Sequence, residues 1–176
     1  MEVLSGPVLV LTALLALAGA FKLRRPAPTA GALRAMSLPS GLLAVRALGA
    51  FELVVGTASM LSANRALLAL SAACYLAFAA FVAAALVSGA PVQSCGCFGQ
   101  PDTPPSRIHL AFDAVAAAVL IAATAGEVPP PASVLADQPW AGVPFVVLTA
   151  TALLLSYLVL TALAAVLSPT HRPRAA

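Results

Sequence analysis

Long runs of apolar residues decide what this chain can fold into. The first run covers residues 3–21, contains no ionisable side chain, and is followed at once by Lys22, Arg24 and Arg25. Its length matches the roughly 20 residues with which a helix crosses the hydrocarbon core of a bilayer. The whole chain is 61% hydrophobic and 9% charged, far more apolar than a soluble core of this size requires. The sequence therefore predicts a protein whose solvent is lipid.

Four further apolar runs follow, separated by residues typical of turns and loops. In lipid each span must satisfy its own backbone hydrogen bonds, so each is expected to be an α-helix. The predicted fold class is all-α: a polytopic transmembrane helix bundle with a four-helix core within residues 1–126 and a fifth, C-terminal span. The five spans are expected at about residues 3–21, 42–61, 66–87, 107–125 and 142–167.

The segments between these spans are rich in proline, glycine and serine. Residues 26–41 are expected to form an interfacial loop with one short helical turn. Residues 127–141 are expected to form a proline-rich extracytoplasmic loop that ends near Trp140, a residue type that anchors chains at membrane interfaces. Residues 168–176 form a basic tail.

The net charge of +3 comes from basic residues at the ends of apolar runs, which indicates membrane orientation rather than nucleic-acid binding. Five spans place successive loops on alternate sides of the membrane. If Arg46 is counted as embedded, Arg65 is the only basic residue on one of the two sides. Cytoplasmic loops carry the excess of positive charge, so the other side is predicted to face the cytoplasm. We therefore expect the N-terminus outside and the C-terminus in the cytoplasm. The basic residues on the predicted cytoplasmic side are Lys22, Arg24, Arg25, Arg34, Arg107, Arg172 and Arg174.

The segment SCGCFGQ, residues 94–100, lies between the third and fourth spans and holds two of the three cysteines. Gly96 lets the backbone fold tightly enough for Cys95 and Cys97 to approach, but a disulfide there would be strained, and strained disulfides are the more oxidising and exchangeable ones. A redox pair is the favoured interpretation; part of a metal site, or no chemistry, are the alternatives. Zinc normally takes four ligands, and Cys95, Cys97 and His109 supply three, so no metal or cofactor is predicted.

Three more residues of the third and fourth spans are candidates for a chemical or a packing role. His109 and Asp113 are four apart on the fourth span and share a face near the end where the cysteine loop enters. A histidine can stabilise a nearby thiolate, so the pair is a candidate for tuning Cys95 and Cys97; the alternative is a polar pair at a helix end. Cys74, in the third span, is expected to serve as a small buried hydrophobic residue.

Glu52 lies near the middle of the second span, where a carboxylate is costly unless it is protonated or paired. Gly49, Glu52, Gly56 and Ser59 follow spacings of three and four, so they are expected to share one inward face on which small residues admit a neighbouring helix. Lys22 is a candidate partner for the carboxylate, as are the two arginines that follow it. Glu52 is either a paired packing residue or a proton- or redox-linked acid.

Three segments together resemble one protein family: GAFKLRRP at 19–26, FELVVG at 51–56 and CGCFG at 95–99. They are similar to the MauE family of methylamine-utilisation proteins, grouped with DoxX-like redox-associated membrane proteins. The similarity covers about residues 3–125 and implies a four-helix inner-membrane protein. It also implies a role in processing, transport or disulfide formation of the methylamine dehydrogenase small subunit, with a thioredoxin-like partner. The family's cysteines would fall on Cys95 and Cys97, its membrane acid on Glu52 and its basic residue on Lys22.

Two classes of function follow. The first is a membrane thiol–disulfide oxidoreductase or maturation factor that acts through Cys95 and Cys97 and exchanges electrons with a thioredoxin-like protein. The second is a non-catalytic membrane scaffold or metal-binding chaperone in which the cysteine loop shapes a docking surface. A transporter that uses Glu52 is a weaker third interpretation, because neither a repeat nor a broken helix is evident in the sequence.

Overall fold

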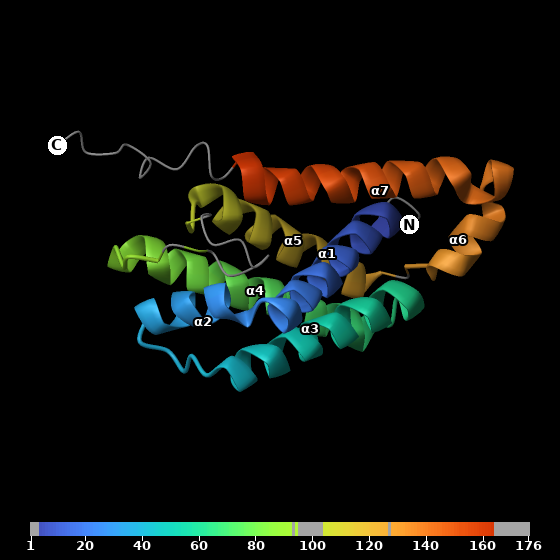
Figure 1. The fold of residues 1–176 in the computed structure, drawn as a ribbon. Coiled ribbons are helices and arrows are strands. Elements are labelled where there is room, and N and C mark those ends of the chain that lie inside the picture. Colours follow the sequence, from blue (N-terminus) through green and yellow to red (C-terminus); the bar gives the residue numbers. More distant parts are fainter. Residues whose placement is uncertain (1–3, 93, 95–103, 127, 164–176) are drawn as a thin grey trace.

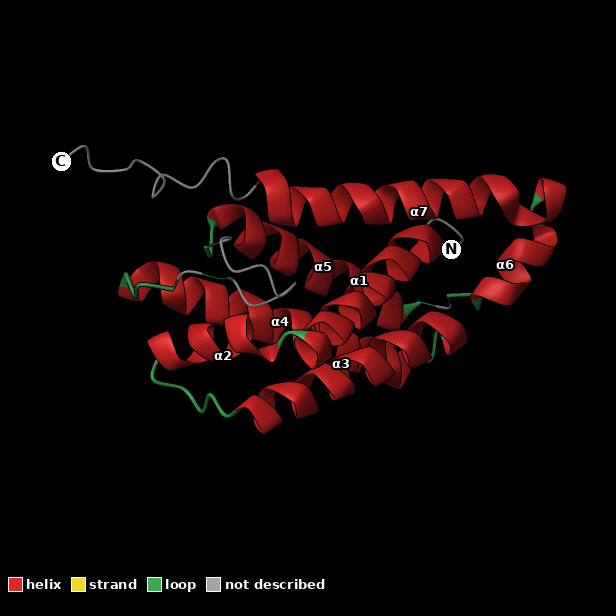
Figure 2. Ribbon diagram, in the orientation of Figure 1, coloured by secondary structure: helices red, strands yellow, loops and turns green. Residues whose placement is uncertain are grey.

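A computed structural model of the chain describes residues 4–92, 94, 104–126 and 128–163. Every regular element in these ranges is a helix, which confirms the predicted all-α class (Figures 1 and 2). The elements in chain order are α1 (Ser5–Arg24), α2 (Pro26–Ala35), α3 (Leu42–Ser62), α4 (Arg65–Ser88), α5 (Arg107–Ala125), α6 (Pro131–Asp137), a 3₁₀ turn (Pro139–Gly142), α7 (Val143–Leu158) and a π-helical turn (Val159–Leu163).

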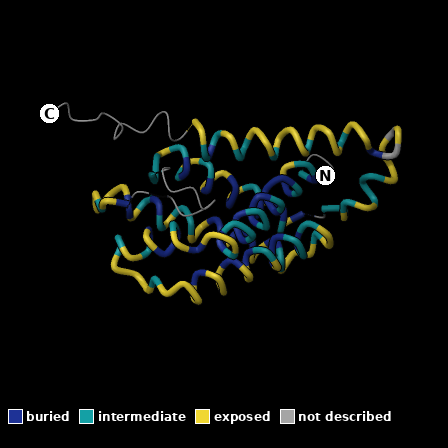
Figure 3. The backbone as a smooth tube through the Cα atoms, in the orientation of Figure 1, coloured by how far each residue is buried: buried dark blue, intermediate teal, exposed yellow. Residues whose placement is uncertain are grey.

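Five of the described helices are long and apolar enough to cross a membrane: α1, α3, α4, α5 and α7 with its π turn. The outward faces of this bundle carry large apolar side chains, among them Leu43, Val54 and Val87 at 82%, 65% and 89% exposure (Figure 3). A soluble protein rarely exposes so large an apolar surface. Lipid therefore covers the bundle, and the chain is a multi-pass membrane protein.

Two segments that the sequence indicated as loops contain helices. Residues 26–35 form α2, which begins with Pro26 at its first position, where the missing N–H costs nothing. Ala32 of α2 packs with Ala85 near the end of α4 and with Val92 in the segment that follows α4, and this burial favours an ordered helix here. In the proline-rich segment after α5, Pro131–Asp137 form α6 and a 3₁₀ turn leads into α7.

Glycines set the distance between α1 and α3, which pack along most of their lengths. A Cβ atom on Gly19 would lie 2.5 Å from the carbonyl oxygen of Gly49, and one on Gly56 would lie 2.6 Å from the backbone nitrogen of Ala16. The backbones of the two helices therefore touch directly, which is the packing that small residues permit between membrane helices. The inward face predicted for α3 is confirmed, because Gly49, Glu52, Gly56 and Ser59 are all buried.

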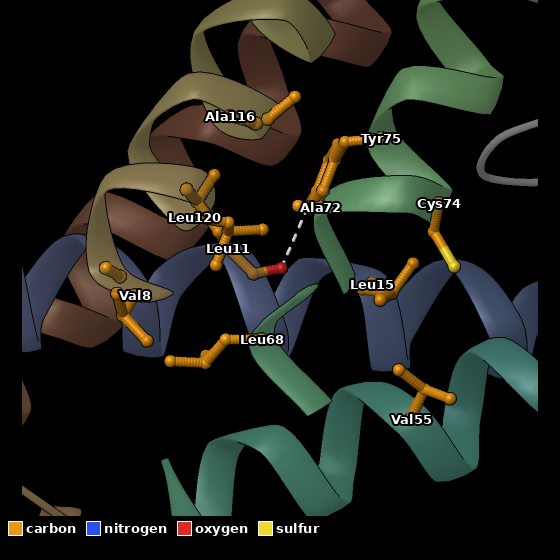
Figure 4. Close-up of a cluster of buried hydrophobic side chains, with 12 residues drawn as sticks. Val8, Leu11, Leu15, Val55, Leu68, Ala72, Cys74, Tyr75, Ala116 and Leu120 are labelled. Atoms are coloured by element: carbon orange, nitrogen blue, oxygen red, sulfur yellow. Dashed lines mark hydrogen bonds between the residues drawn. The ribbon is translucent and has the colours of Figure 1, made fainter. Parts of the chain in front are cut away.

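The main core lies between α1, α4 and α5, with Val55 contributed by α3 (Figure 4). Leu11 and Leu15 of α1 face Leu68 and Tyr75 of α4 in this cluster. The Tyr75 hydroxyl donates a hydrogen bond of 2.8 Å to the carbonyl oxygen of Leu11, so the one polar atom of that side chain is satisfied inside the core.

The fifth span lies along the outside of the other four (Figure 1). No residue of α7 itself is buried. In the π turn that continues it, Leu160 packs with Leu14 and Ala18 of α1, and the ring of Tyr157 stacks on Phe21 at 6.2 Å between centroids. These contacts join the C-terminal end of the fifth span to α1.

We predict that Gly56→Ala destabilises the bundle by about 1–3 kcal/mol, because the new methyl group would press on the backbone of α1 and force the helices apart. Gly31→Ala in α2 is the matched control: nothing lies within 4 Å of a Cβ atom there, and alanine is the better helix former. Unfolding by SDS titration in detergent micelles measures both changes. Equal stability of the two variants would contradict the close α1–α3 contact.

Candidate functional site

A buried ion pair joins the first and third helices. The Lys22 Nζ lies 2.6 Å from the Glu52 Oε2, and the two residues are 2% and 0% exposed. Of the three basic residues that the sequence offered as partners, Lys22 makes the pair, while Arg24 and Arg25 are exposed. Two opposite charges thus meet inside the bundle rather than at its surface.

The backbone explains why Lys22 points inward. Side chains on a helix lean toward its N-terminus, so a lysine near the end of α1 is directed back along the helix into the bundle. Gly49 provides the room, because a Cβ atom on it would lie 2.8 Å from the Cβ of Lys22. Glu52 follows Gly49 by three residues and so lies on the same face of α3. The space at Gly49 and the one-turn spacing from Gly49 to Glu52 therefore allow the Lys22 amine to reach the Glu52 carboxylate.

Two residues of α4 complete the surroundings of the pair. The Lys22 Nζ lies 4.9 Å from the centroid of the Phe78 ring, a cation–π arrangement. Cys74 is buried on the same helix, one turn before Phe78. The second carboxylate oxygen, Glu52 Oε1, is buried and has no hydrogen-bond partner among the described residues. It is an acceptor that a proton or a water molecule can occupy.

Such a pair affects the stability of the protein mainly through the free-energy cost of losing one of its two charges. Burying both charges carries a desolvation cost that their attraction must offset, so the intact pair adds little net stability. A single remaining charge in the same place costs about 3–5 kcal/mol. Lys22 and Glu52 therefore hold α1 and α3 in one register, because sliding either helix would separate the charges.

A second polar group lies at the start of α5. His109 is buried; its Nδ1 is 2.9 Å from the hydroxyl of Ser106 and its Nε2 is 2.9 Å from the carbonyl oxygen of Leu160. A carbonyl can only accept, so Nε2 carries a hydrogen; in the neutral ring Nδ1 then accepts from Ser106. The Leu160 carbonyl belongs to the π turn, where the usual helical bonding is altered. His109 thus connects the four-helix core to the fifth span.

Asp113 follows His109 by one turn of α5 and is buried as well. Both side chains line a small cavity of about 20 Å³, which is enough for one water molecule. Tyr75 and Phe78 also line this cavity, and the same Phe78 ring lies next to the Lys22 amine. Phe78 is thus common to the surroundings of the ion pair and to those of the histidine.

The structure brings together some of the residues that the sequence singled out. Lys22 pairs with Glu52, and His109 and Asp113 share one cavity. Cys95 and Cys97 lie outside the described residues. Among the residues that are described, no three histidine, cysteine, aspartate or glutamate side chains gather closely enough to hold a metal ion.

The sequence did not reveal the contribution of α4. Tyr75 and Phe78 wall the cavity, and Ser71 shares a buried hydrogen bond of 2.9 Å with Ser59 of α3. A signal was present, because these positions follow Ser71 by four and seven residues and mark one face of the helix. This face did not stand out in the sequence, because the opposite face of α4 is apolar as well. The acceptor for His109, a main-chain carbonyl at Leu160, has no sequence signal at all.

Comparison with known protein families gives a match over most of the chain. The family model described as "Methylamine utilisation protein MauE" matches residues 2–126, which include α1 to α5 and the cysteine loop. No curated protein and no solved structure matches the chain. The matched region ends before α6, so the fifth span lies beyond it.

We predict that Lys22→Met lowers the free energy of unfolding by about 3–5 kcal/mol, because it leaves Glu52 buried without a counter-charge. Combining it with Glu52→Gln should restore part of the loss, since neither charge then remains. Arg34→Met, which removes an exposed basic residue of α2, is the control and should be nearly neutral. SDS titration measures all three; a Lys22→Met effect no larger than the control would refute the role of the pair.

We also predict that His109→Leu loosens the contact between α5 and the end of α7 at a cost of about 1–3 kcal/mol, because the Leu160 carbonyl loses its donor in a buried place. Spin labels at two exposed positions, Ala111 of α5 and Leu158 of α7, should show a broader distance distribution in this variant. Ser106→Ala keeps the bond from Nε2 and should leave the distribution narrow. Identical distributions in both variants would count against the connection.

Proposed function

The chain belongs to the MauE family, and from that premise we propose that it is an integral membrane thiol–disulfide redox factor that acts through Cys95 and Cys97. The observation that carries the proposal is that the family match covers residues 2–126, a range that includes the Cys-Gly-Cys segment. Two cysteines separated by one glycine suit reversible exchange better than a permanent crosslink, because the closed form is strained.

The proposed step is a thiol–disulfide exchange, in which the electrons that one pair of cysteines loses are gained by the other pair. The Cys95 thiolate attacks one sulfur of a disulfide in the partner, forms a mixed disulfide and releases the other partner sulfur as a thiolate. Cys97, after giving up its proton, attacks the Cys95 sulfur and releases the partner as a dithiol. Cys95 and Cys97 are oxidised to a disulfide and the partner is reduced; the reverse sequence oxidises the partner.

The helix ends on either side of the cysteine segment support the proposal, because they are firmly held. Before the segment, Val92 packs against α2 and Ser94 is buried. After the segment, Ser106 begins α5 and is bonded to His109, which is itself bonded to Leu160. A reactive pair needs fixed anchors if a partner is to meet it in one geometry.

In this proposal the two polar groups inside the bundle are positioning residues. Lys22 and Glu52 hold α1 against α3, and His109 holds the start of α5. Nε2 of His109 is bonded to the Leu160 carbonyl, so a hydrogen bond from the ring to a thiolate would have to come from Nδ1, the nitrogen that faces Ser106. The proposed tuning of Cys95 and Cys97 therefore requires that this hydrogen bond exchange during the reaction.

The partner that fits this chemistry is a thioredoxin-like protein, whose own cysteines undergo the same exchange. The family's name supports a pathway of methylamine utilisation. We propose the methylamine dehydrogenase small subunit as the protein that benefits from the exchange. The exposed Arg24, Arg25, Arg34 and Arg107 lie at the end of the bundle where α1 and α4 end and α5 begins, and we call this the basic end. By the charge rule we propose that the basic end faces the cytoplasm, with the N-terminus outside the inner membrane.

A trapping experiment tests the proposal. The Cys97→Ser variant should accumulate a mixed disulfide between Cys95 and a thioredoxin-like protein, because the resolving thiol is missing. Cys74→Ser is the matched control: its thiol is buried in the core, so trapping should be unchanged when it is combined with Cys97→Ser. The double variant Cys95→Ser/Cys97→Ser should trap nothing and should lose maturation of the client.

Two results would overturn the redox proposal. One is full maturation activity in the double serine variant, which would favour a scaffold. The other is stoichiometric zinc in the purified protein that disappears in Cys95→Ser, which would favour a metal-binding chaperone. Labelling the thiols with a membrane-impermeant reagent, in whole cells and in inverted vesicles, separately tests which side the basic end faces.

A further inference from the structure

A small cavity lies between the N-terminal end of α1 and the C-terminal end of α3, at the end of the bundle opposite the basic end. Its volume is about 10 Å³. Val128, in the segment that leads into α6, and Phe145 of α7 line it on other sides. Two of the lining residues carry a hydroxyl group, Ser5 of α1 and Ser59 of α3. The cavity therefore has one polar side chain on each of two helices.

The Ser5 hydroxyl lacks the partner that a buried hydroxyl normally has. Ser5 is 6% exposed, and its Oγ makes no hydrogen bond to any described residue. Other hydroxyl groups of the bundle donate to a carbonyl one turn earlier in their own helix, as Thr12 does to the carbonyl oxygen of Val8 at 2.8 Å. Ser5 is the first residue of α1, so no earlier turn of that helix precedes it. A buried polar atom in this state is costly unless something else bonds to it.

The Ser59 hydroxyl can supply a second hydrogen-bonding group to the same cavity. Ser59 is 1% exposed, and its Oγ lies 2.9 Å from the Oγ of Ser71 in α4. Each hydroxyl carries one hydrogen, and a single bond between the two uses only one of them. When Ser71 donates to Ser59, the hydrogen of Ser59 is left for another acceptor. Because Ser59 lines the cavity, an acceptor placed there can take it.

We propose that one water molecule occupies this cavity and joins Ser5 to Ser59. Its oxygen can accept a hydrogen bond from each of the two hydroxyl groups. Pro129, which also lines the cavity, has no N–H, so its main chain can only accept, as the hydrogens of a water molecule require. A buried water needs two to four polar partners and a volume of at least about 10–15 Å³. The cavity is at the lower limit of this range, so nothing larger than a water molecule fits.

The water would connect the same two helices as the buried ion pair, but at the other end of α1. Ser59 follows Glu52 by two helical turns and shares its buried face of α3. Lys22 and Ser5 lie in the last and first turns of α1. The α1–α3 contact, whose close approach depends on glycines, would thus have a polar connection toward each end. This site does not depend on the redox proposal.

The stability of Ser5→Ala distinguishes an occupied cavity from an empty one by the sign of the change. If the water is bound, the variant removes one of its partners, and the equilibrium constant for folding should fall by about fivefold, the effect of one average hydrogen bond. If the cavity is empty, the variant removes a buried hydroxyl that has no partner, and the constant should rise. SDS titration in micelles measures it; a rise or no change would overturn the proposal.

Ser62→Ala is the matched control, because the Ser62 hydroxyl is exposed and donates to the Ala58 carbonyl of its own helix. Its effect should be small and should add to that of Ser5→Ala. Ser59→Ala should instead be non-additive with Ser5→Ala, since both remove a partner of the same water molecule. Full additivity of the Ser5 and Ser59 substitutions would contradict a shared water.

Direct observation of the water does not depend on a variant. A high-resolution crystal structure of the wild-type protein should show a density peak about 2.5–3.0 Å from both Ser5 Oγ and Ser59 Oγ, the distance of an O–H···O bond. An empty cavity in that structure would refute the site. A Ser5 hydroxyl that turns to a main-chain carbonyl and leaves Ser59 alone would refute it as well.

Discussion

The close contact between α1 and α3 is the constraint on which the rest of the bundle depends. Gly19, Gly49 and Gly56 bring the two backbones together, and this proximity lets the Lys22 amine reach the Glu52 carboxylate. Attraction between buried charges decreases steeply if the helices separate or slide, since the surroundings have a low dielectric constant. The glycines and the ion pair therefore specify one register, on which α4 and α5 are then packed.

Much of this arrangement could be predicted from the sequence. The apolar runs identified the five spanning helices, and the spacing of Gly49, Glu52 and Gly56 identified the inward face of α3, because helical periodicity alone determines which residues share a side. Lys22 was one of three candidate partners for Glu52, together with Arg24 and Arg25, because these basic residues follow the first span directly.

Other features could not be predicted, and the reasons are physical. Residues 26–35 carry two prolines and a glycine and suggest a loop, but burial of Ala32 against α4 outweighs that local preference. The face of α4 that Tyr75 and Phe78 share with Ser71 did not stand out from the rest of the helix, because a helix with protein on one side and lipid on the other is apolar all round. Contacts that end on a main-chain atom, such as His109 with Leu160, leave no trace in the identity of the partner residue.

That last contact bears on how the fifth span can change over time. The acceptor is a backbone carbonyl, so the bond survives replacement of the Leu160 side chain by any residue that keeps the π turn and the local packing. The sequence of the fifth helix is therefore only weakly constrained by its attachment to the core. A chain built in this way can alter the lipid-facing surface of the added helix while the attachment to His109 stays the same.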